Sequence, residues 1–166
     1  RGGYESAPYK AVKQDGKFEL RDYPAIVVAE TPMRGSDGSF MRLFRFIDGK
    51  NAEQKKIPMT TPVFFASDST NSTMAFVMPE KMTVDQTPRP NETSVVIRQV
   101  PGGRFAVLRF SGGRNGSNED EHLTALRDWM VAQKLTPEGG PIFAYFDPPW
   151  TPTFMRRNEV MVRLAK

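Results

Sequence analysis

Cysteine is absent from this 166-residue chain, and histidine occurs once, as His122. Without cysteine the chain can form no disulfide, no thiolate metal site and no cysteine nucleophile. A single imidazole also excludes a metal site built from several histidines. His122 follows three acidic residues in the first turn of a predicted second helix, and we expect it to be a solvated helix residue. The alternative is a neutral ligand, because a helix N-terminus disfavours the protonated imidazole.

Long apolar runs are also missing. The most continuous one, AIVVA (Ala25 to Ala29), is far shorter than the roughly 20 residues of a membrane-spanning helix, so no integral membrane segment is predicted. Hydrophobic residues make up 39% of the chain and charged residues 25%, which is typical of a globular protein. The net charge of +4 is scattered along the sequence, so we predict no nucleic-acid partner.

Motifs of known enzyme classes are missing too. The stretch FSGG (Phe110 to Gly113) lacks the spacing of a nucleophile elbow, and no phosphate-binding or dinucleotide fingerprint occurs. We therefore predict no catalytic residues and a protein that is not an enzyme. The chain starts with Arg1 rather than methionine, which is compatible with a processed exported or organellar protein and leaves the compartment open.

The order of predicted elements repeats along the chain. Residues 18–31 form a strand, residues 40–47 an amphipathic helix ended by Gly49, and two strands follow; the second half shows the same order, with Asn118 expected to cap its helix. We predict an α+β fold in which a duplicated strand-helix-strand-strand unit forms a twisted, barrel-like antiparallel sheet with two flanking helices. Residues 1–166 would be one domain of two pseudo-repeats, about 9–80 and 94–166.

Prolines interrupt one strand-like stretch, KKIPMTTPVFF (Lys55 to Phe65). Apolar residues alternate along it, yet Pro58 and Pro62 cannot donate to a ladder, which predicts an edge or a bulge. Met59 is either a flexible filler of an irregular corner or a ligand, and packing is the favoured interpretation.

Two segments carry candidate ligand-binding residues. In the first helix, Phe40, Leu43, Phe44 and Ile47 are predicted to form the apolar face, and Met41 and Arg45 share the adjacent face at i, i+4 spacing. An arginine beside an apolar groove suits a flat amphiphile with carboxylates, although it could equally cover the edge of the core. The second segment is the proline-rich turn with Trp150 and Phe154, which either serves recognition or closes the core while Arg157 pairs with Glu159 or with an acid of the first half.

Six segments, in order, resemble the SOUL haem-binding protein family over about residues 9–164. They are FELRDYP (Phe18 to Pro24), AET (Ala29 to Thr31), LFRFIDGKN (Leu43 to Asn51), KIPMTTPV (Lys56 to Val63), RFAVLRFSG (Arg104 to Gly112) and FAYFDPPWTPTFMRRNEV (Phe143 to Val160). The resemblance implies a twisted antiparallel sheet with two helices, akin to bacterial effector-binding domains. It also implies non-covalent binding of haem or a related tetrapyrrole in a hydrophobic cleft beside the first helix.

Carried onto this chain, the resemblance implies a cleft bordered by the first helix, with the Trp150 turn opposite. The implied binding residues are Phe40, Met41, Phe44, Arg45, Met59, Trp150 and Phe154. Some relatives carry histidine where this chain has Asp22, and others carry lysine where it has Thr151. The iron ligand is therefore unknown: Met41, Met59, Tyr23 and Tyr145 are possible donors, and binding through the porphyrin face and propionates alone is equally compatible.

The function that follows is a haem or tetrapyrrole carrier or buffer. The alternative is an effector-binding or protein-interaction module for another flat or amphipathic ligand, without catalysis. An enzyme on this fold is a third hypothesis, which the single histidine and the missing triad disfavour.

Overall fold

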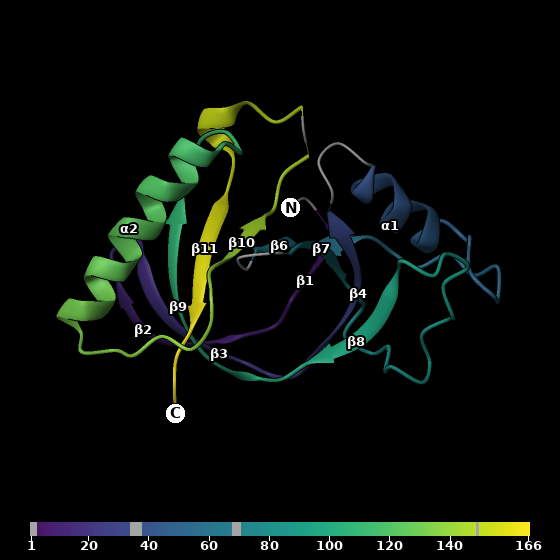
Figure 1. The fold of residues 1–166 in the computed structure, drawn as a ribbon, viewed down its shortest axis with the longest axis horizontal. Helices are drawn as coiled ribbons and strands as arrows, with labels where there is room; N and C mark the ends of the chain where they lie inside the picture. Colours follow the sequence, from purple (N-terminus) through teal and green to yellow (C-terminus); the bar gives the residue numbers. More distant parts are fainter. Residues whose placement is uncertain (1–2, 34–37, 68–70, 149) are drawn as a thin grey trace. The chain divides into compact units, whose positions relative to one another are not determined.

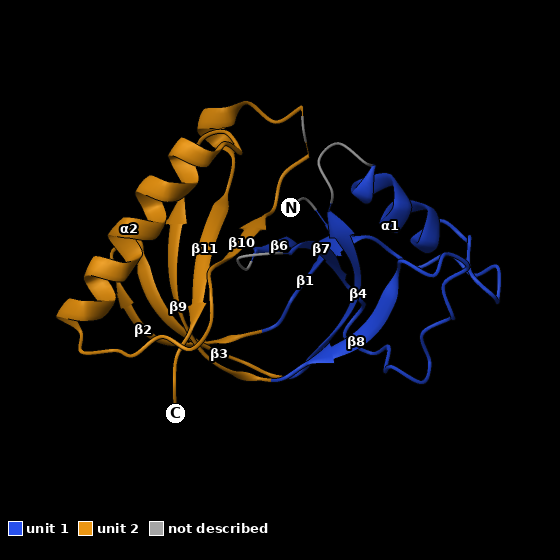
Figure 2. Ribbon diagram, in the orientation of Figure 1, with its two compact units in different colours: residues 1–8, 25–101 blue, residues 9–24, 102–166 orange. Residues whose placement is uncertain are grey.

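Mainly antiparallel strands and two α-helices make up the described part of the chain, which confirms the predicted α+β class (Figure 1). This computed structural model describes residues 3–33, 38–67, 71–148 and 150–166. The chain divides into unit 1, residues 1–8 and 25–101, and unit 2, residues 9–24 and 102–166 (Figure 2). Each unit combines one helix with an antiparallel sheet.

Unit 1 contains a four-stranded sheet in the order β6-β7-β4-β8, with neighbours antiparallel. A short parallel pair, β1 with β5, accompanies it. The elements of unit 1 are β1 (Glu5–Ser6), β4 (Ile26–Met33), α1 (Ser39–Ile47), β5 (Thr60–Thr61), β6 (Val63–Ser67), β7 (Ser72–Val77) and β8 (Val96–Val100).

Helix α1 packs on the sheet of unit 1, but with a different face from the one predicted. Leu43 and Ile47 are buried as expected, whereas Phe40 and Phe44 are exposed and Phe46 is buried in their place. The helix is apolar on more than one side, so periodicity alone could not select the face. Contact with the core residues of β4 and β7 selects it instead.

The stretch from Lys55 to Phe65 is not one continuous strand, because proline cannot donate a ladder hydrogen bond. Pro58 precedes β5, and Pro62 separates β5 from β6, so neither proline lies within a strand. Ile57 is buried, and Met59 packs against the core cluster of unit 1. The sequence favoured a packing role for Met59, and in the structure its partly buried side chain contacts the core of unit 1.

Unit 2 contains a five-stranded antiparallel sheet in the order β2-β3-β9-β11-β10. Helix α2 covers one face of it, as Figure 1 shows. The elements of unit 2 are β2 (Lys10–Asp15), β3 (Phe18–Tyr23), β9 (Gly103–Phe110), α2 (Gly116–Ala132), β10 (Ile142–Tyr145), the 3₁₀ turn η1 (Thr153–Met155) and β11 (Asn158–Arg163).

Helix α2 starts earlier than predicted. Asn115, not Asn118, caps it, because the Asn115 side chain accepts a hydrogen bond of 2.9 Å from the backbone N–H of Asn118. Leu126, Trp129 and Met130 are buried against the sheet, as the sequence indicated, and Leu123 is partly buried beside them.

Apart from the two-residue strand β5 and the 3₁₀ turn η1, the order of elements is the same in β4-α1-β6-β7 of unit 1 and β9-α2-β10-β11 of unit 2. Gene duplication stays a prediction. The compact units differ from the segments 9–80 and 94–166, because residues 9–24 belong with the second half. The barrel-like closure was wrong: among the described residues, β2 and β8 each pair along one edge only, so the twisted sheet stays open.

Candidate ligand-binding surface of helix α1

Three large apolar side chains of α1 point away from the core. Phe40, Met41 and Phe44 are 44%, 50% and 37% exposed. The rings of Phe40 and Phe44 are nearly parallel, with centroids 6.4 Å apart and an interplanar angle of 12°. Met41 lies on the adjacent side of the helix, and together the three side chains form an exposed apolar surface that suits contact with a planar ligand.

Contacts beneath this face hold it in place. The edge of Phe40 meets the buried ring of Phe76 on β7, with centroids 5.2 Å apart. Arg42 ties the helix to β4, because its guanidinium donates to the hydroxyl of buried Thr31 at 2.7 Å and to the carbonyl of Pro32 at 2.8 Å. The exposed face of α1 therefore belongs to a rigidly attached helix.

Arg45 adds a cation next to Phe44, and the structure gives it a partner. Its guanidinium donates twice to one carboxylate oxygen of Glu92, at 3.1 Å and 2.8 Å. Both side chains are well exposed, so this is a solvent-screened ion pair that a ligand carboxylate could replace. The sequence suggested Arg45 but not Glu92, which lies in the connector before β8.

Two further predicted binding residues lie in unit 2. Trp150 and Phe154 are 82% and 77% exposed, so they do not close the core. Arg157 does pair with Glu159, at 2.8 Å, as one of the two sequence alternatives proposed. Trp150 and Phe154 are thus exposed apolar side chains of unit 2, and a site shared with α1 stays a prediction.

The two tyrosines considered as iron ligands are poorly suited to that role. Burial raises the pKa of Tyr23 to about 12, although the Arg21 guanidinium, which donates to its hydroxyl at 2.9 Å, acts in the opposite direction. Burial and a hydrogen bond to Glu119 raise the pKa of Tyr145 as well. Since iron binds tyrosine as the phenolate, both environments oppose ligation.

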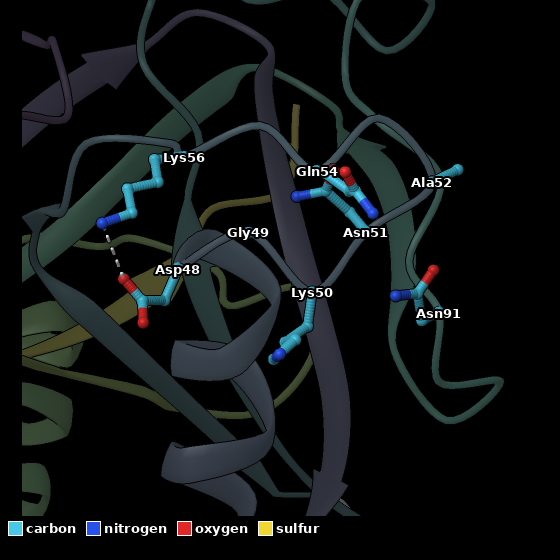
Figure 3. Close-up of a pocket in the computed structure, with 8 residues that line it drawn as sticks. All are labelled: Asp48, Gly49, Lys50, Asn51, Ala52, Gln54, Lys56 and Asn91. Carbon is cyan, nitrogen blue, oxygen red and sulfur yellow. Dashed lines mark ion pairs between the residues drawn. The ribbon is translucent and has the colours of Figure 1, made fainter.

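A polar pocket of about 560 Å³ lies at the C-terminal end of α1 (Figure 3). Its walls are Asp48, Gly49, Lys50, Asn51, Ala52, Gln54, Lys56 and Asn91. Asn51 organises this loop: its amide donates to the carbonyls of Phe46 and Lys55, at 2.9 Å and 2.8 Å, and its oxygen accepts from the N–H groups of Glu53 and Lys55. The end of the segment LFRFIDGKN thus stabilises the loop that follows α1 through the hydrogen bonds of Asn51. The pocket beside it is lined mainly by polar side chains, which do not suit an apolar porphyrin ring.

Sequence reasoning proposed the Arg157–Glu159 pair but missed the buried charged cluster of unit 2 to which that pair belongs. Arg21 and Glu159 are 1% and 0% exposed and pair through two hydrogen bonds, while Glu19 and Arg157 contribute a further charge of each sign. The available signal was the alternation of β3, which places Glu19, Arg21 and Tyr23 on one face. Among the described residues, no group of three or more histidine, aspartate or glutamate side chains could hold a metal ion.

Comparison with known proteins gives this geometry a context. A family model described as SOUL heme-binding protein matches residues 4–163. The chain belongs to the SOUL haem-binding protein family. This SOUL chain is 30% identical over 134 residues to Heme-binding protein 2 of Homo sapiens and 28% identical over 133 residues to Heme-binding protein 2 of Mus musculus. Each alignment covers 72% of this chain and 64% of the relative, so the chain spans less than two thirds of those proteins.

Solved structures share the fold at low sequence identity. The C-terminal domain of EcmrR superposes with a TM-score of 0.67 at 13% identity, covering 95% of this SOUL chain and 98% of that domain. A hydrolase from Listeria innocua gives a TM-score of 0.63 at 12% identity, with coverages of 92% and 94%. These likenesses concern the fold alone. Of the helices in the described parts of the chain, none combines the length and apolarity needed to cross a membrane.

Proposed function

We propose that this chain binds haem or a related tetrapyrrole non-covalently and acts as a carrier or buffer, without catalysis. The observation that supports the proposal is the exposed apolar surface formed by Phe40, Met41 and Phe44 on α1. Membership in a haem-binding family and relatives named as haem-binding proteins supply the ligand class.

The residues of α1 fit the two chemical parts of haem. A porphyrin is a flat aromatic ring system, and the parallel rings of Phe40 and Phe44 offer it a stacking surface. Its propionates are carboxylates, and Arg45 presents a planar guanidinium that binds carboxylates through two hydrogen bonds. Met41 is the thioether of the same exposed face, and thioethers serve as haem-iron ligands in cytochromes.

Titration with haemin, followed at the Soret band, tests this assignment. Phe44→Ser should weaken binding at least about tenfold, because the variant loses one of the two stacking rings. Val96→Ser is the matched control, since Val96 is also an exposed apolar residue of unit 1, at 52% exposure. Absence of saturable binding at micromolar protein would contradict the proposed function.

The charge contribution has its own matched control. Arg45 and Arg98 are 47% and 48% exposed, both lie in unit 1, and each pairs with one glutamate, Glu92 or Glu30. Arg45→Ala should lower haemin affinity, whereas Arg98→Ala should leave it unchanged. Equal effects of the two variants would show that only net charge matters and would remove Arg45 from the site.

Native mass spectrometry of the protein from its own host separates this function from the effector-binding alternative. A co-purified porphyrin would support the carrier or buffer. A different small molecule, or a partner protein on the same surface, would support the interaction module.

A further inference from the structure

Unit 2 contains a second groove, remote in sequence from α1. Its volume is about 500 Å³, within the range of sites that hold drug-sized ligands. The groove lies between the β2–β3 turn, the end of β9 and helix α2, and all of its lining residues belong to unit 2. The groove therefore shares no lining residue with the candidate surface of α1.

Two stacked aromatic pairs frame this groove. The rings of Phe18 and Trp129 lie 5.2 Å apart at 11°, and those of Phe110 and His122 lie 4.3 Å apart at 14°. The indole N–H of Trp129 donates to the carboxylate of Asp15 at 2.9 Å, which fixes the orientation of that ring. Both pairs are thus held in place before any ligand arrives.

A small residue leaves the space between the pairs open. His122, Ala125 and Trp129 follow each other at helical spacing on α2, and all three line the groove. His122 and Trp129 are seven residues apart, about 10 Å along the helix axis. Ala125 between them is only half-buried, so its methyl group leaves room that a larger side chain would fill.

The hydrogen bonds of His122 determine which ring nitrogen is available. Nδ1 lies 2.7 Å from the backbone carbonyl oxygen of Asn118, and since a carbonyl only accepts, Nδ1 carries the hydrogen. In the neutral ring, Nε2 then holds a lone pair. Within the described part of the chain Nε2 makes no hydrogen bond, and the carboxylate of Glu121 is 3.7 Å from it.

This is the arrangement of a metal-binding histidine. Ligating histidines commonly donate the second ring N–H to a backbone carbonyl, which fixes the tautomer and makes the ligating nitrogen more basic. A positive centre at Nε2 would also be attracted by Glu121. The chain has no other histidine and no cysteine, so His122 is its sole source of an imidazole ligand.

We propose that the groove is a second iron-porphyrin site, in which Nε2 of His122 ligates the iron and the half-buried Phe18 and Ala125 contact the porphyrin, while the buried rings of Phe110 and Trp129 support them from beneath. Lys17 and Arg109 also line the groove and supply cations for the propionates. The inference shares its ligand class with the proposed function, but it uses none of the α1 residues. It assigns His122, which the sequence suggested to be a solvated helix residue, a role in binding.

Magnetic circular dichroism of the full chain with ferric haem tests the ligand. The expected result is a signature of nitrogen ligation that disappears in His122→Phe, a change that removes both ring nitrogens and keeps a ring to stack on Phe110. Metal-free protoporphyrin IX should bind His122→Phe and the unchanged chain equally, because no iron is present to ligate. A nitrogen signature that survives His122→Phe, or that is absent from the unchanged chain, would overturn the proposal.

A steric variant checks the groove independently of the ligand. Ala125→Leu fills the space between the aromatic pairs, and Ala132→Leu makes the same change at an exposed position of α2. Ala125→Leu should remove the nitrogen signature, and Ala132→Leu should leave it intact. Persistence of the signature in Ala125→Leu would place the iron outside the groove.

The outcomes separate this inference from the proposed function. In one outcome, Phe44→Ser and Arg45→Ala weaken haemin binding, and His122→Phe changes neither the affinity nor the spectrum. That outcome supports the α1 site and contradicts the second site. In the opposite outcome, His122→Phe removes the nitrogen signature and the α1 variants bind haemin normally. That outcome supports the second site and contradicts the α1 site.

Discussion

Arg21 and Glu159 hold each other through two hydrogen bonds of 2.7 Å, from one guanidinium to both oxygens of one carboxylate. They lie 138 residues apart, on β3 and β11, the two strands that flank β9. Glu19 also accepts from Arg21, and Arg157 donates to Glu159 at 2.8 Å. The cluster thus contains two positive and two negative charges, and its side chains link β3 to β11 across the intervening strand β9.

Removing one partner of the Arg21–Glu159 pair should strongly lower the free energy of unfolding. Glu159→Ala leaves the Arg21 guanidinium buried without its main partner, and we expect a loss of about 3 kcal/mol in the free energy of unfolding. The double variant Arg21→Met, Glu159→Leu removes both charges and should recover most of that loss. Urea denaturation measures both variants.

A neighbouring pair provides the control for the Glu159 experiment. Asp22 and Arg104 form a similar two-bond pair on β3 and β9, but both side chains are well exposed. Asp22→Ala should therefore leave the urea midpoint nearly unchanged. An equal loss of stability in Asp22→Ala and Glu159→Ala would mean that burial of the pair is unimportant.

Stability should also depend on Glu159 below the ordinary glutamate pKa of 4.5. Burial alone would raise the pKa of Glu159, but the hydrogen bonds and charges of Arg21 and Arg157 outweigh it and lower that pKa. In acid the unfolded chain then binds a proton that the folded chain does not, so the contribution is complete above pH 4.5 and is lost as pH falls through the lowered value. In Glu159→Gln the fall in urea midpoint below pH 4.5 should be shallower, and an unchanged slope would contradict this linkage.

Much of the fold could be predicted from the sequence because local signals and the tertiary structure agree. The sequence predicted strand structure over residues 18–31, which the structure divides at Pro24 into β3 and β4, and Gly49 predicted the end of α1. The partners of β3 could not be predicted in the same way. Tyr23 and Pro24 end β3 just where the chain passes from unit 2 to unit 1, and no local pattern tells which sheet a strand joins.

The sequence indicated which residues of α1 are candidates for the site, but not which of their side chains face the core and which face solvent. The helix sequence contains Phe40, Phe44 and Phe46, and two apolar faces are compatible with that spacing. Only contact with β4 and β7 shows that Phe46 enters the core and that the other two rings remain exposed. The tautomer of His122 likewise depends on the backbone carbonyl of Asn118, which becomes its partner only once α2 has formed.

Asn51 should contribute strongly to the stability of unit 1. It is 2% exposed, and its side chain makes four hydrogen bonds to backbone groups around the end of α1. Asn51→Ala leaves several of those groups without partners, and we expect a loss of at least about 2 kcal/mol in the free energy of unfolding. Asn91→Ala makes the same change at an exposed wall of the same pocket and should cost little, so similar urea midpoints for the two variants would contradict this role.

Glu92 should weaken haem binding at α1 by competing for Arg45. In Glu92→Gln the carboxylate that accepts both guanidinium hydrogen bonds becomes a neutral amide, so a propionate meets less competition. An exposed ion pair contributes about 0.2–1 kcal/mol, which corresponds to an affinity gain of roughly 1.4-fold to fivefold. Haemin titration measures the gain, and Glu53→Gln, the same change at an exposed position of unit 1, controls for net charge. The gain should vanish in Arg45→Ala, Glu92→Gln; if it persists there, Glu92 does not act through Arg45.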